Sequence, residues 1–209
     1  MGVQEVKNRA FSEMLKVAKE RLFNRAAAEI SANTGIGFDA ETSEFRLSSL
    51  GRDIRIGYPG YAMAPAINEW HQLAILHYLD MADGAALQDR LIPFGELTHG
   101  FVRGGGFDRQ SERLISQTLA NRSPAQLQEA CERLGASIRP SNADFCAVFP
   151  FLPRYPVTLK LWFADEELPG NGRMFLDGSA DHYLSVEDAV TVGTLILEEL
   201  SACLAEKTV

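Results

Sequence analysis

A twelve-residue stretch near the end of the chain carries oxygen-bearing side chains at the spacing of a calcium-binding loop. It runs from Asp177 to Asp188 and has Asp177, Ser179, Asp181, Ser185 and Asp188 at positions 1, 3, 5, 9 and 12. A hard cation such as Ca²⁺ needs several converging oxygens, which alternate residues of a tight loop can supply. The spacing therefore predicts a divalent-cation site with Asp177, Asp181 and Asp188 as metal ligands.

Two features of this loop depart from the calcium-binding pattern. His182 stands where that pattern has glycine, and Asp188 replaces a longer glutamate. The structural alternative is that Asp177 and Asp181 form turns, while Ser185 opens the following helix in a capping box with Asp188. If the loop is functional instead, a metal-assisted hydrolase or transferase would use Asp177 and Asp181 as ligands and His182 as base.

Histidines are the other candidate ligands. His77 falls within an apolar helical segment, where a buried imidazole could be the axial ligand of a haem or a corrinoid. The alternative is a core histidine that is hydrogen-bonded to a carbonyl group. His71 and His77 are six residues apart, so they lie on different helix faces and do not form a chelating pair. His99 and His182 are further candidates for binding the cofactor.

A glycine-rich stretch from His99 to Arg109 combines backbone donors with two arginines, Arg103 and Arg109. Such groups beside a helix start can hold a phosphate or a carboxylate. No Lys-Ser/Thr pair follows and no clear strand precedes, so this is neither a P-loop nor a dinucleotide fingerprint. The alternative is a mobile hinge before a helix. Arg103 is thus a candidate contact for an anionic group, and Trp162, on the more polar side of its strand, a candidate for lining a cleft.

Bulk composition restricts the classes of function. The 209 residues, 46% hydrophobic and 23% charged, are ordinary for one globular domain. A net charge of −8 without a basic stripe argues against nucleic acid as the partner. The three cysteines are widely spaced and form no C-x-x-C pair, which argues against a zinc site or an iron–sulfur cluster within the chain. So few cysteines also fit a reducing cytoplasm. No apolar run predicts a signal peptide or a membrane span.

Hydrophobic periodicity predicts the elements that must position these residues. We expect helices over about 6–32, 66–82, 109–120, 124–135 and 185–205, and strands over 37–39, 44–48, 53–57, 91–94, 144–149, 157–163 and 173–176. The strands gather in two groups separated by helices, so the prediction is an α+β fold in which mainly antiparallel sheets pack with a central buried helix and peripheral helices. The single domain spans 1–209, with an N-terminal helix and meander (1–62), a helical middle (63–140), and C-terminal strands and helix (141–209).

Several short segments carry a resemblance to a known family. They are Leu76–Leu79, Ile92–Leu97, Arg133–Gly135, Leu152–Pro156, Leu161–Trp162, Glu167–Pro169, Phe175–Asp177 and His182–Asp188. Together they resemble a domain-of-unknown-function family of anaerobic bacteria and archaea. In that family the domain occurs alone or behind a cysteine-rich iron–sulfur segment like that of corrinoid proteins. This chain lacks such a segment, so any cluster role implied by the resemblance requires a partner protein.

Three functions follow as expectations. The first is a cytoplasmic small-ligand-binding or accessory protein of an anaerobic cofactor system, with a tetrapyrrole (haem or corrinoid) as ligand and a corrinoid or iron–sulfur protein as a possible partner. Its candidate contacts are His77, His99, His182, Arg103 and Trp162. The second is the metal-assisted enzyme described above. The third is a protein-interaction module without a small ligand.

Overall fold

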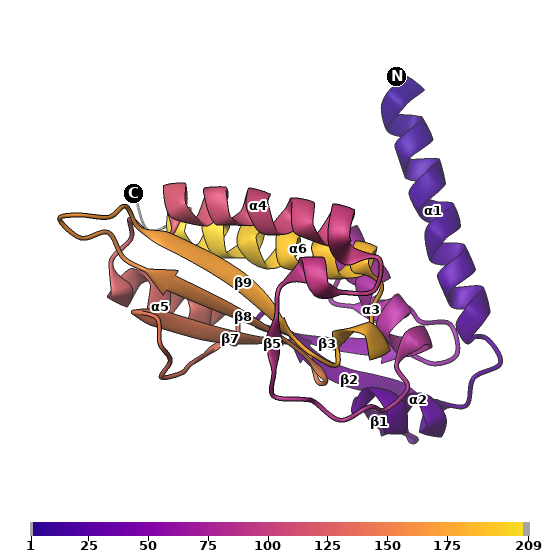
Figure 1. Ribbon diagram of the computed structural model, residues 1–209. Helices are drawn as coiled ribbons and strands as arrows, with labels where there is room; N and C mark the ends of the chain where they lie inside the picture. Colours follow the sequence, from indigo (N-terminus) through magenta and orange to yellow (C-terminus); the bar gives the residue numbers. More distant parts are fainter. Residues whose placement is uncertain (1, 207–209) are drawn as a thin grey trace.

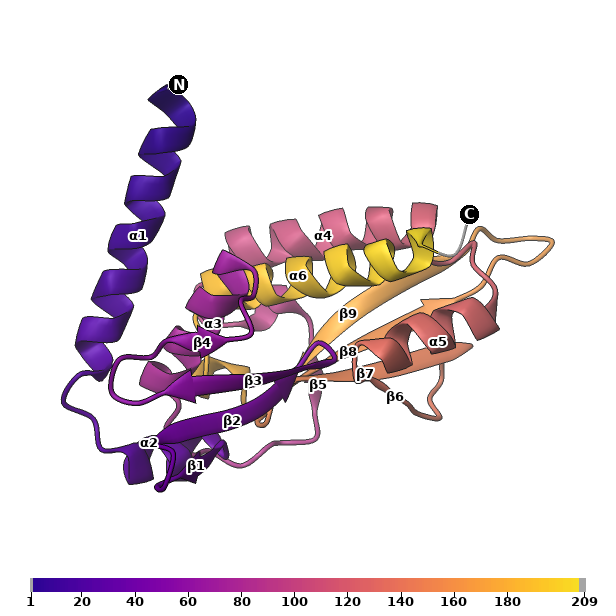
Figure 2. The ribbon, with the colours of Figure 1, turned by 180° about the vertical axis from the view of Figure 1, so that it is seen from behind.

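The chain folds as an α+β domain built from two antiparallel sheets and six α-helices in the part that the structure describes (Figures 1 and 2). The computed structural model describes residues 2–206, with side chains from residue 11 onward. The predicted fold class is confirmed.

The first sheet has strand order β1-β2-β3-β4, from β1 (Gly37–Asp39), β2 (Glu44–Ser49), β3 (Arg52–Gly57) and β4 (Met63–Ala64). The second has order β5-β9-β8-β7-β6, from β5 (Leu91–Ile92), β6 (Ser137–Ile138), β7 (Phe145–Leu152), β8 (Tyr155–Trp162) and β9 (Asn171–Asp177). All neighbouring strands in both sheets are antiparallel. The predicted three-strand meander is confirmed and is extended by the short strand β4.

The helical elements are α1 (Gly2–Leu22), α2 (Ala27–Thr34), α3 (Glu69–Met81), α4 (Gly100–Thr118), α5 (Pro124–Arg133) and α6 (Val186–Ala205), with short 3-10 turns η1 (Phe94–Glu96) and η2 (Ala180–His182). Figure 1 shows α4 and α6 side by side along one face of the five-stranded sheet. The apolar side chains of β8 that alternate along the strand, Val157, Leu159 and Leu161, are fully buried. Because successive side chains of a strand point to opposite sides, one face of this sheet lines the core.

Helix α3 lies at the centre, as predicted, because its side chains reach both sheets and α2. Leu73 and Leu76 are buried. The hydroxyl of Tyr78 donates to the carbonyl of Thr34 at 2.7 Å. One side of α3 is covered by α1 and remains partly open, so that Trp70 is 48% exposed. Asn68 caps the helix by accepting from the backbone N–H of Trp70 at 2.8 Å.

Two predicted helix boundaries are wrong. The segment predicted as one helix over 6–32 is two, α1 and α2, separated by a turn after Leu22. Helix α4 does not begin after the glycine run but continues through it from Gly100. A side chain at Gly104 would overlap the backbone of Phe94, so this glycine permits close packing of α4 on η1. The close approach of two backbones, rather than a hinge, accounts for Gly104.

Neighbouring residues on β8 give a paired test of the sheet's two faces. Leu161→Ala should lower the free energy of unfolding by about 2–5 kcal/mol, because Leu161 is fully buried. Trp162→Ala should cost about 1 kcal/mol, since Trp162 is half-buried on the outer face and its indole N–H donates to the carbonyl of Asn142 at 3.3 Å. Urea denaturation with unchanged m-values measures both losses. Equal losses would contradict the assignment of faces.

Candidate functional site

A histidine–carboxylate pair joins the middle of α3 to the first turn of α6. His77 Nδ1 lies 2.7 Å from Asp188 Oδ1. Asp188 is buried, and its other oxygen, Oδ2, accepts from the Ser185 hydroxyl at 2.7 Å. Because a carboxylate only accepts, Nδ1 carries a proton, and in the neutral imidazole Nε2 carries the lone pair. The pair therefore fixes both the tautomer and the orientation of the imidazole.

The Ser185 cap that was predicted from the sequence holds this carboxylate in place. The backbone N–H of Asp188 donates to Ser185 Oγ at 3.2 Å, as expected for a residue that caps α6. The same hydroxyl then donates to the Asp188 side chain, so the predicted capping box is modified: Asp188 bonds the hydroxyl. This leaves Asp188 Oδ1 for His77.

A surface hollow of about 340 Å³ lies between α1 and α3 beside this pair. His77 lines it from α3, and α1 contributes Glu13, Met14, Val17, Ala18 and Arg21. The His77 side chain is 27% exposed, and its Nε2 makes no hydrogen bond or ion pair to the residues described within 11–206. The hollow thus combines an oriented imidazole with apolar side chains, the carboxylate of Glu13 and the guanidinium of Arg21.

Tyr155 adds an unusual polar atom to the same region. Its side chain is buried, and its hydroxyl has no hydrogen-bond partner among the described residues. Burial raises the pKa of Tyr155 well above its ordinary value, and the negative charges of Asp188 and Asp181 raise it further. Buried hydroxyls without a partner are rare in folded proteins. The hydroxyl therefore stays protonated and remains free to donate.

The core histidine of α3 is His71, whereas His77, considered from the sequence as a buried ligand or a core histidine, is only partly buried. His71 is 1% exposed, its Nε2 lies 2.8 Å from Ser49 Oγ, and its ring lies 5.0 Å from that of Phe151. Burial lowers the pKa of His71 to about 4, and the positive charge of Arg52 acts in the same direction. His71 is thus a neutral, structural imidazole at the junction of the two sheets.

Two aspartates of the twelve-residue loop, Asp177 and Asp181, accept hydrogen bonds from the segment that leads from α3 to α4. Asp177 Oδ1 accepts from the backbone N–H of Gln88 at 2.9 Å and from the hydroxyl of Ser179 at 2.6 Å. Burial alone would raise the pKa of Asp177, but these bonds outweigh it and hold the pKa below its usual value. Asp181 accepts from the Thr98 backbone N–H at 3.0 Å. Each carboxylate thereby satisfies a backbone donor that lacks a sheet or helix partner.

His182 has a separate partner. Its Nδ1 lies 2.7 Å from Asp83 Oδ2, and this bond holds the pKa of Asp83 below its usual value. Asp177, Asp181 and Asp188 therefore bind three different partners. Nowhere among the described residues do three or more His, Cys, Asp or Glu side chains form a group that could hold a metal ion. The geometry favours the turn-and-cap alternative for this loop.

The remaining predicted contacts lie outside the hollow beside His77. His99 is exposed at the start of α4, in the left-handed region at a φ of 59°. Arg103 is exposed on α4 and lines a different hollow, between α4 and α6. Trp162 lies on the outer face of the sheet. The structure thus gathers His77 with Asp188 and does not gather the other predicted contacts around them.

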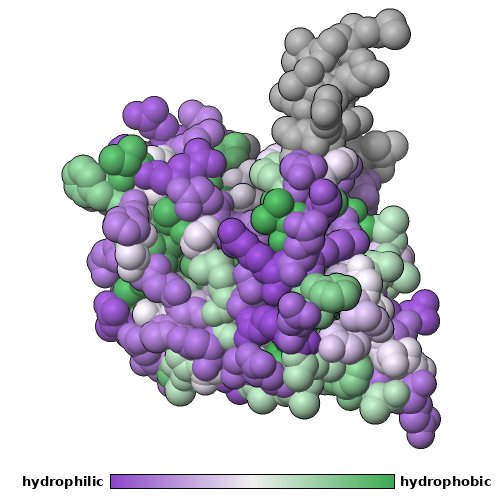
Figure 3. Space-filling view, turned by 90° about the vertical axis from the view of Figure 1, so that its right-hand side faces the viewer, coloured by the Kyte–Doolittle hydropathy of each residue, from purple (hydrophilic) through white to green (hydrophobic). Residues whose placement is uncertain are grey.

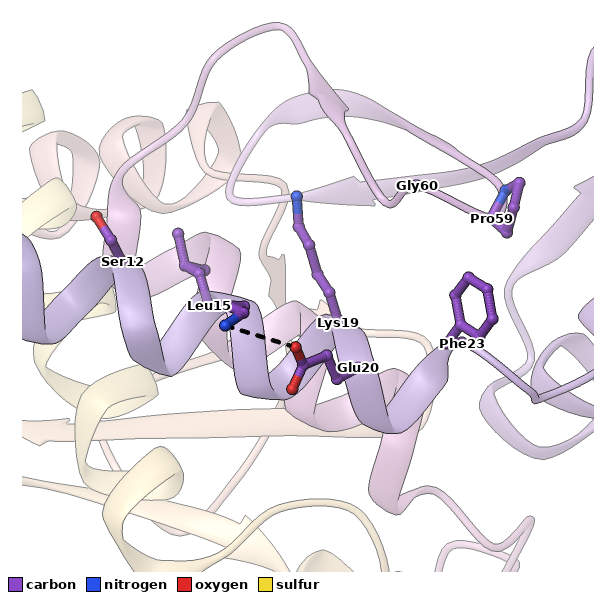
Figure 4. Close-up of a pocket in the computed structure, with 8 residues that line it drawn as sticks. Ser12, Leu15, Lys19, Glu20, Phe23, Pro59 and Gly60 are labelled. Carbon is purple, nitrogen blue, oxygen red and sulfur yellow. Dashed lines mark ion pairs between the residues drawn. The ribbon is translucent and has the colours of Figure 1, made fainter.

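A second hollow of about 500 Å³ lies on another side of α1, against the turn between β3 and β4 (Figure 4). Leu15, Lys19 and Phe23 reach it from α1, and Pro59 and Gly60 form the other wall. Figure 3 views this side of the molecule and shows small groups of apolar side chains among polar ones. This second hollow has no histidine or buried carboxylate in its lining, so we place the candidate site at His77.

Sequence reasoning missed three of these features: the pairing of His77 with Asp188, the free hydroxyl of Tyr155 and the hollow under α1. His77 and Asp188 are 111 residues apart, and no spacing connects them. The apolar content of α3 on all sides was a signal that one of its histidines is buried, but it could not decide between His71 and His77.

Comparison with known proteins agrees with the resemblance to a domain-of-unknown-function family. No curated protein and no solved structure matches the chain. No helix in residues 2–206 has the length and hydrophobicity to cross a membrane. Residues 26–199, which include His77, Asp188 and both sheets, match a family described as Domain of unknown function (DUF3786). Since this match covers most of the chain, the protein belongs to the DUF3786 family.

Proposed function

We propose that the protein is a cytoplasmic cofactor-binding or accessory protein whose ligand is a tetrapyrrole, and that His77 Nε2 would bind its metal. One observation carries the proposal: Asp188 engages Nδ1 of His77 at 2.7 Å, so Nε2 is the ring nitrogen left for a ligand, and His77 lines a hollow. Histidines that bind metals almost always donate their other ring N–H to a carboxylate or a carbonyl. Asp188 supplies that second partner before any ligand arrives.

The lining of the hollow fits such a group. Met14, Val17 and Ala18 offer apolar contacts for a planar ring. The Arg21 guanidinium is largely exposed and pairs with Asp80 at 4.0 Å, a pairing that it would exchange for one with a ring carboxylate. When bound, the tetrapyrrole would supply a redox-active or ligand-exchanging metal. The chain's own residues orient the imidazole and hold a proton at Nδ1.

The sequence resemblance supports a role in an anaerobic cofactor system. Relatives with an iron–sulfur segment like that of corrinoid proteins suggest a corrinoid or iron–sulfur protein as the partner. The metal-assisted enzyme has less support, because Asp177, Asp181 and His182 are engaged by Gln88, Thr98 and Asp83. A protein-interaction module without a small ligand would not account for the orientation of the His77 imidazole by Asp188.

Purified protein mixed with haemin or hydroxocobalamin should develop a shifted visible spectrum, because nitrogen ligation changes the absorption of the metal centre. His77→Ala should abolish the shift. Asp188→Asn should weaken ligand affinity by about 10–100-fold, which is typical for loss of a partner behind a metal ligand. Spectral titration gives the affinity of each variant.

His99→Ala and His182→Ala are the matched controls, since both remove a histidine that lies outside the hollow. Both variants should keep the spectral shift. A thermal melt of His77→Ala checks that the variant is folded. A protein that takes up neither haemin nor cobalamin, or a shift that persists in folded His77→Ala, would rule the proposal out.

A further inference from the structure

The outward face of helix α4 carries an unusual set of side chains. In Figures 1 and 2 α4 lies on the outside of the molecule, with the sheet on its other side. The residues of this outward face are Val102, Arg103, Gly106, Arg109, Gln110, Arg113, Leu114 and Gln117. They recur at three- and four-residue spacing, so they share one side of the helix. Phe101 and Val102 at its beginning are 87% and 78% exposed.

The three arginines of this face have no partner among the side chains that the structure describes. Neither a hydrogen bond nor an ion pair connects the side chains of Arg103, Arg109 and Arg113 to any residue that the structure describes. The acids of α4 are engaged elsewhere: Asp108 accepts from the backbone N–H groups of Phe94 and Gly95, and Glu112 pairs with Arg173. In a chain with a net charge of −8, α4 therefore presents a purely cationic outer face.

Gly106 lies in the middle of this face and has no packing role. A Cβ added there would meet nothing within 4 Å, in contrast to Gly104. Glycine in a helix interior costs about 0.5–1 kcal/mol relative to alanine. Packing within the fold does not require this glycine. Because glycine has no side chain, the surface at the middle of the face lies closer to the helix backbone than at its neighbours. Gly106 also lines the hollow between α4 and α6 and a second hollow whose lining residues all come from α4.

A hollow of about 590 Å³ runs beside the face, between α4 and α6. Its apolar lining consists of Val102, Phe107, Leu114, Val190 and Leu197. Gln110 and Thr194 add hydrogen-bonding groups, and Glu198 lines it as well without an ion pair to the three arginines. A hollow of this kind can receive an apolar side chain from a partner that the arginines hold by charge.

We infer that the outward face of α4 docks an acidic segment of a partner protein. Arg103 and Arg113 are ten residues apart, which is about 15 Å along the helix. That separation suits several carboxylates along a chain better than one small anion. Arginine and exposed aromatic residues are the types enriched at the centres of protein interfaces. The negative charge of this protein as a whole disfavours a nucleic-acid polyanion.

The probe is a fluorescein-labelled 15-residue peptide of repeating Glu-Glu-Leu units, measured by fluorescence anisotropy against the full chain. We expect binding in low salt that weakens at least about tenfold when salt is raised from 0.05 to 0.5 M, because the pairing is between exposed charges. Arg109→Glu with Arg113→Glu should weaken binding at least about tenfold. A peptide with glutamine in place of glutamate should bind at least about tenfold less tightly.

The matched control is Arg55→Glu with Arg122→Glu. It makes the same change in net charge and also uses arginines whose side chains have no ion pair among the described residues. Equal weakening by the two double variants would overturn the inference, since only net charge would then matter. So would complete displacement of the peptide by equimolar tripolyphosphate, which would indicate a small-anion site. Self-association that Arg109→Glu with Arg113→Glu abolishes would overturn it too, by identifying a second copy as the occupant.

Discussion

Gly104→Ala is expected to lower the free energy of unfolding by about 3 kcal/mol, the upper part of the usual range for overpacking. An added Cβ would overlap the carbonyl oxygen of Phe94, and backbone cannot rotate away as a side chain can. The segment is also held in place, because the N–H groups of Phe94 and Gly95 donate to Asp108 at 3.1 and 2.9 Å. The helix must therefore move off η1, and these bonds must lengthen.

Gly106→Ala is the matched control on the same helix. Its Cβ would enter open space, so only the higher helix propensity of alanine acts. The substitution should raise the free energy of unfolding by about 0.5–1 kcal/mol. Chemical denaturation of both variants tests the pair. If Gly104→Ala proves as stable as Gly106→Ala, α4 does not approach η1 as closely as described.

Protonation of His71 is expected to cost the folded protein about 3 kcal/mol of stability between pH 6.5 and pH 4. The pKa of His71 falls from its ordinary 6.5 to about 4 in the folded protein, chiefly because of burial. Between these pH values His71 therefore binds a proton in the unfolded chain but stays neutral in the folded one. Stability is complete above pH 6.5 and falls by about 1.4 kcal/mol per pH unit below it.

His71→Gln should remove this part of the pH dependence, because glutamine does not titrate. The measurement is the free energy of unfolding in urea at several pH values for the two proteins. Ser49→Ala removes the hydroxyl that lies 2.8 Å from His71 Nε2 but keeps the buried imidazole, so it should retain the loss at low pH. An unchanged slope in His71→Gln would mean that His71 is not the group responsible.

Local features of the fold could be predicted from the sequence. Ser123 caps α5 by accepting from the N–H of Gln126, and Ser185 caps α6 in the same way through Asp188. Gly35 ends α2 with a φ of 73°, as expected of a glycine after a helix. The alternating strand β8 buries the predicted face. All of these depend on groups within a few residues of each other, so the spacing alone specifies them.

Only the tertiary structure decided the candidate site. His77 and Asp188 come together because α3 packs against the first turn of α6, and no local pattern encodes that contact. Helix α4 passes through its glycine run because η1 lies against Gly104, although helix propensity alone predicts a break there. The sequence by itself thus determined the fold class and the helix caps. Which histidine is buried and which pairs with Asp188 was decided by packing between segments far apart in the chain.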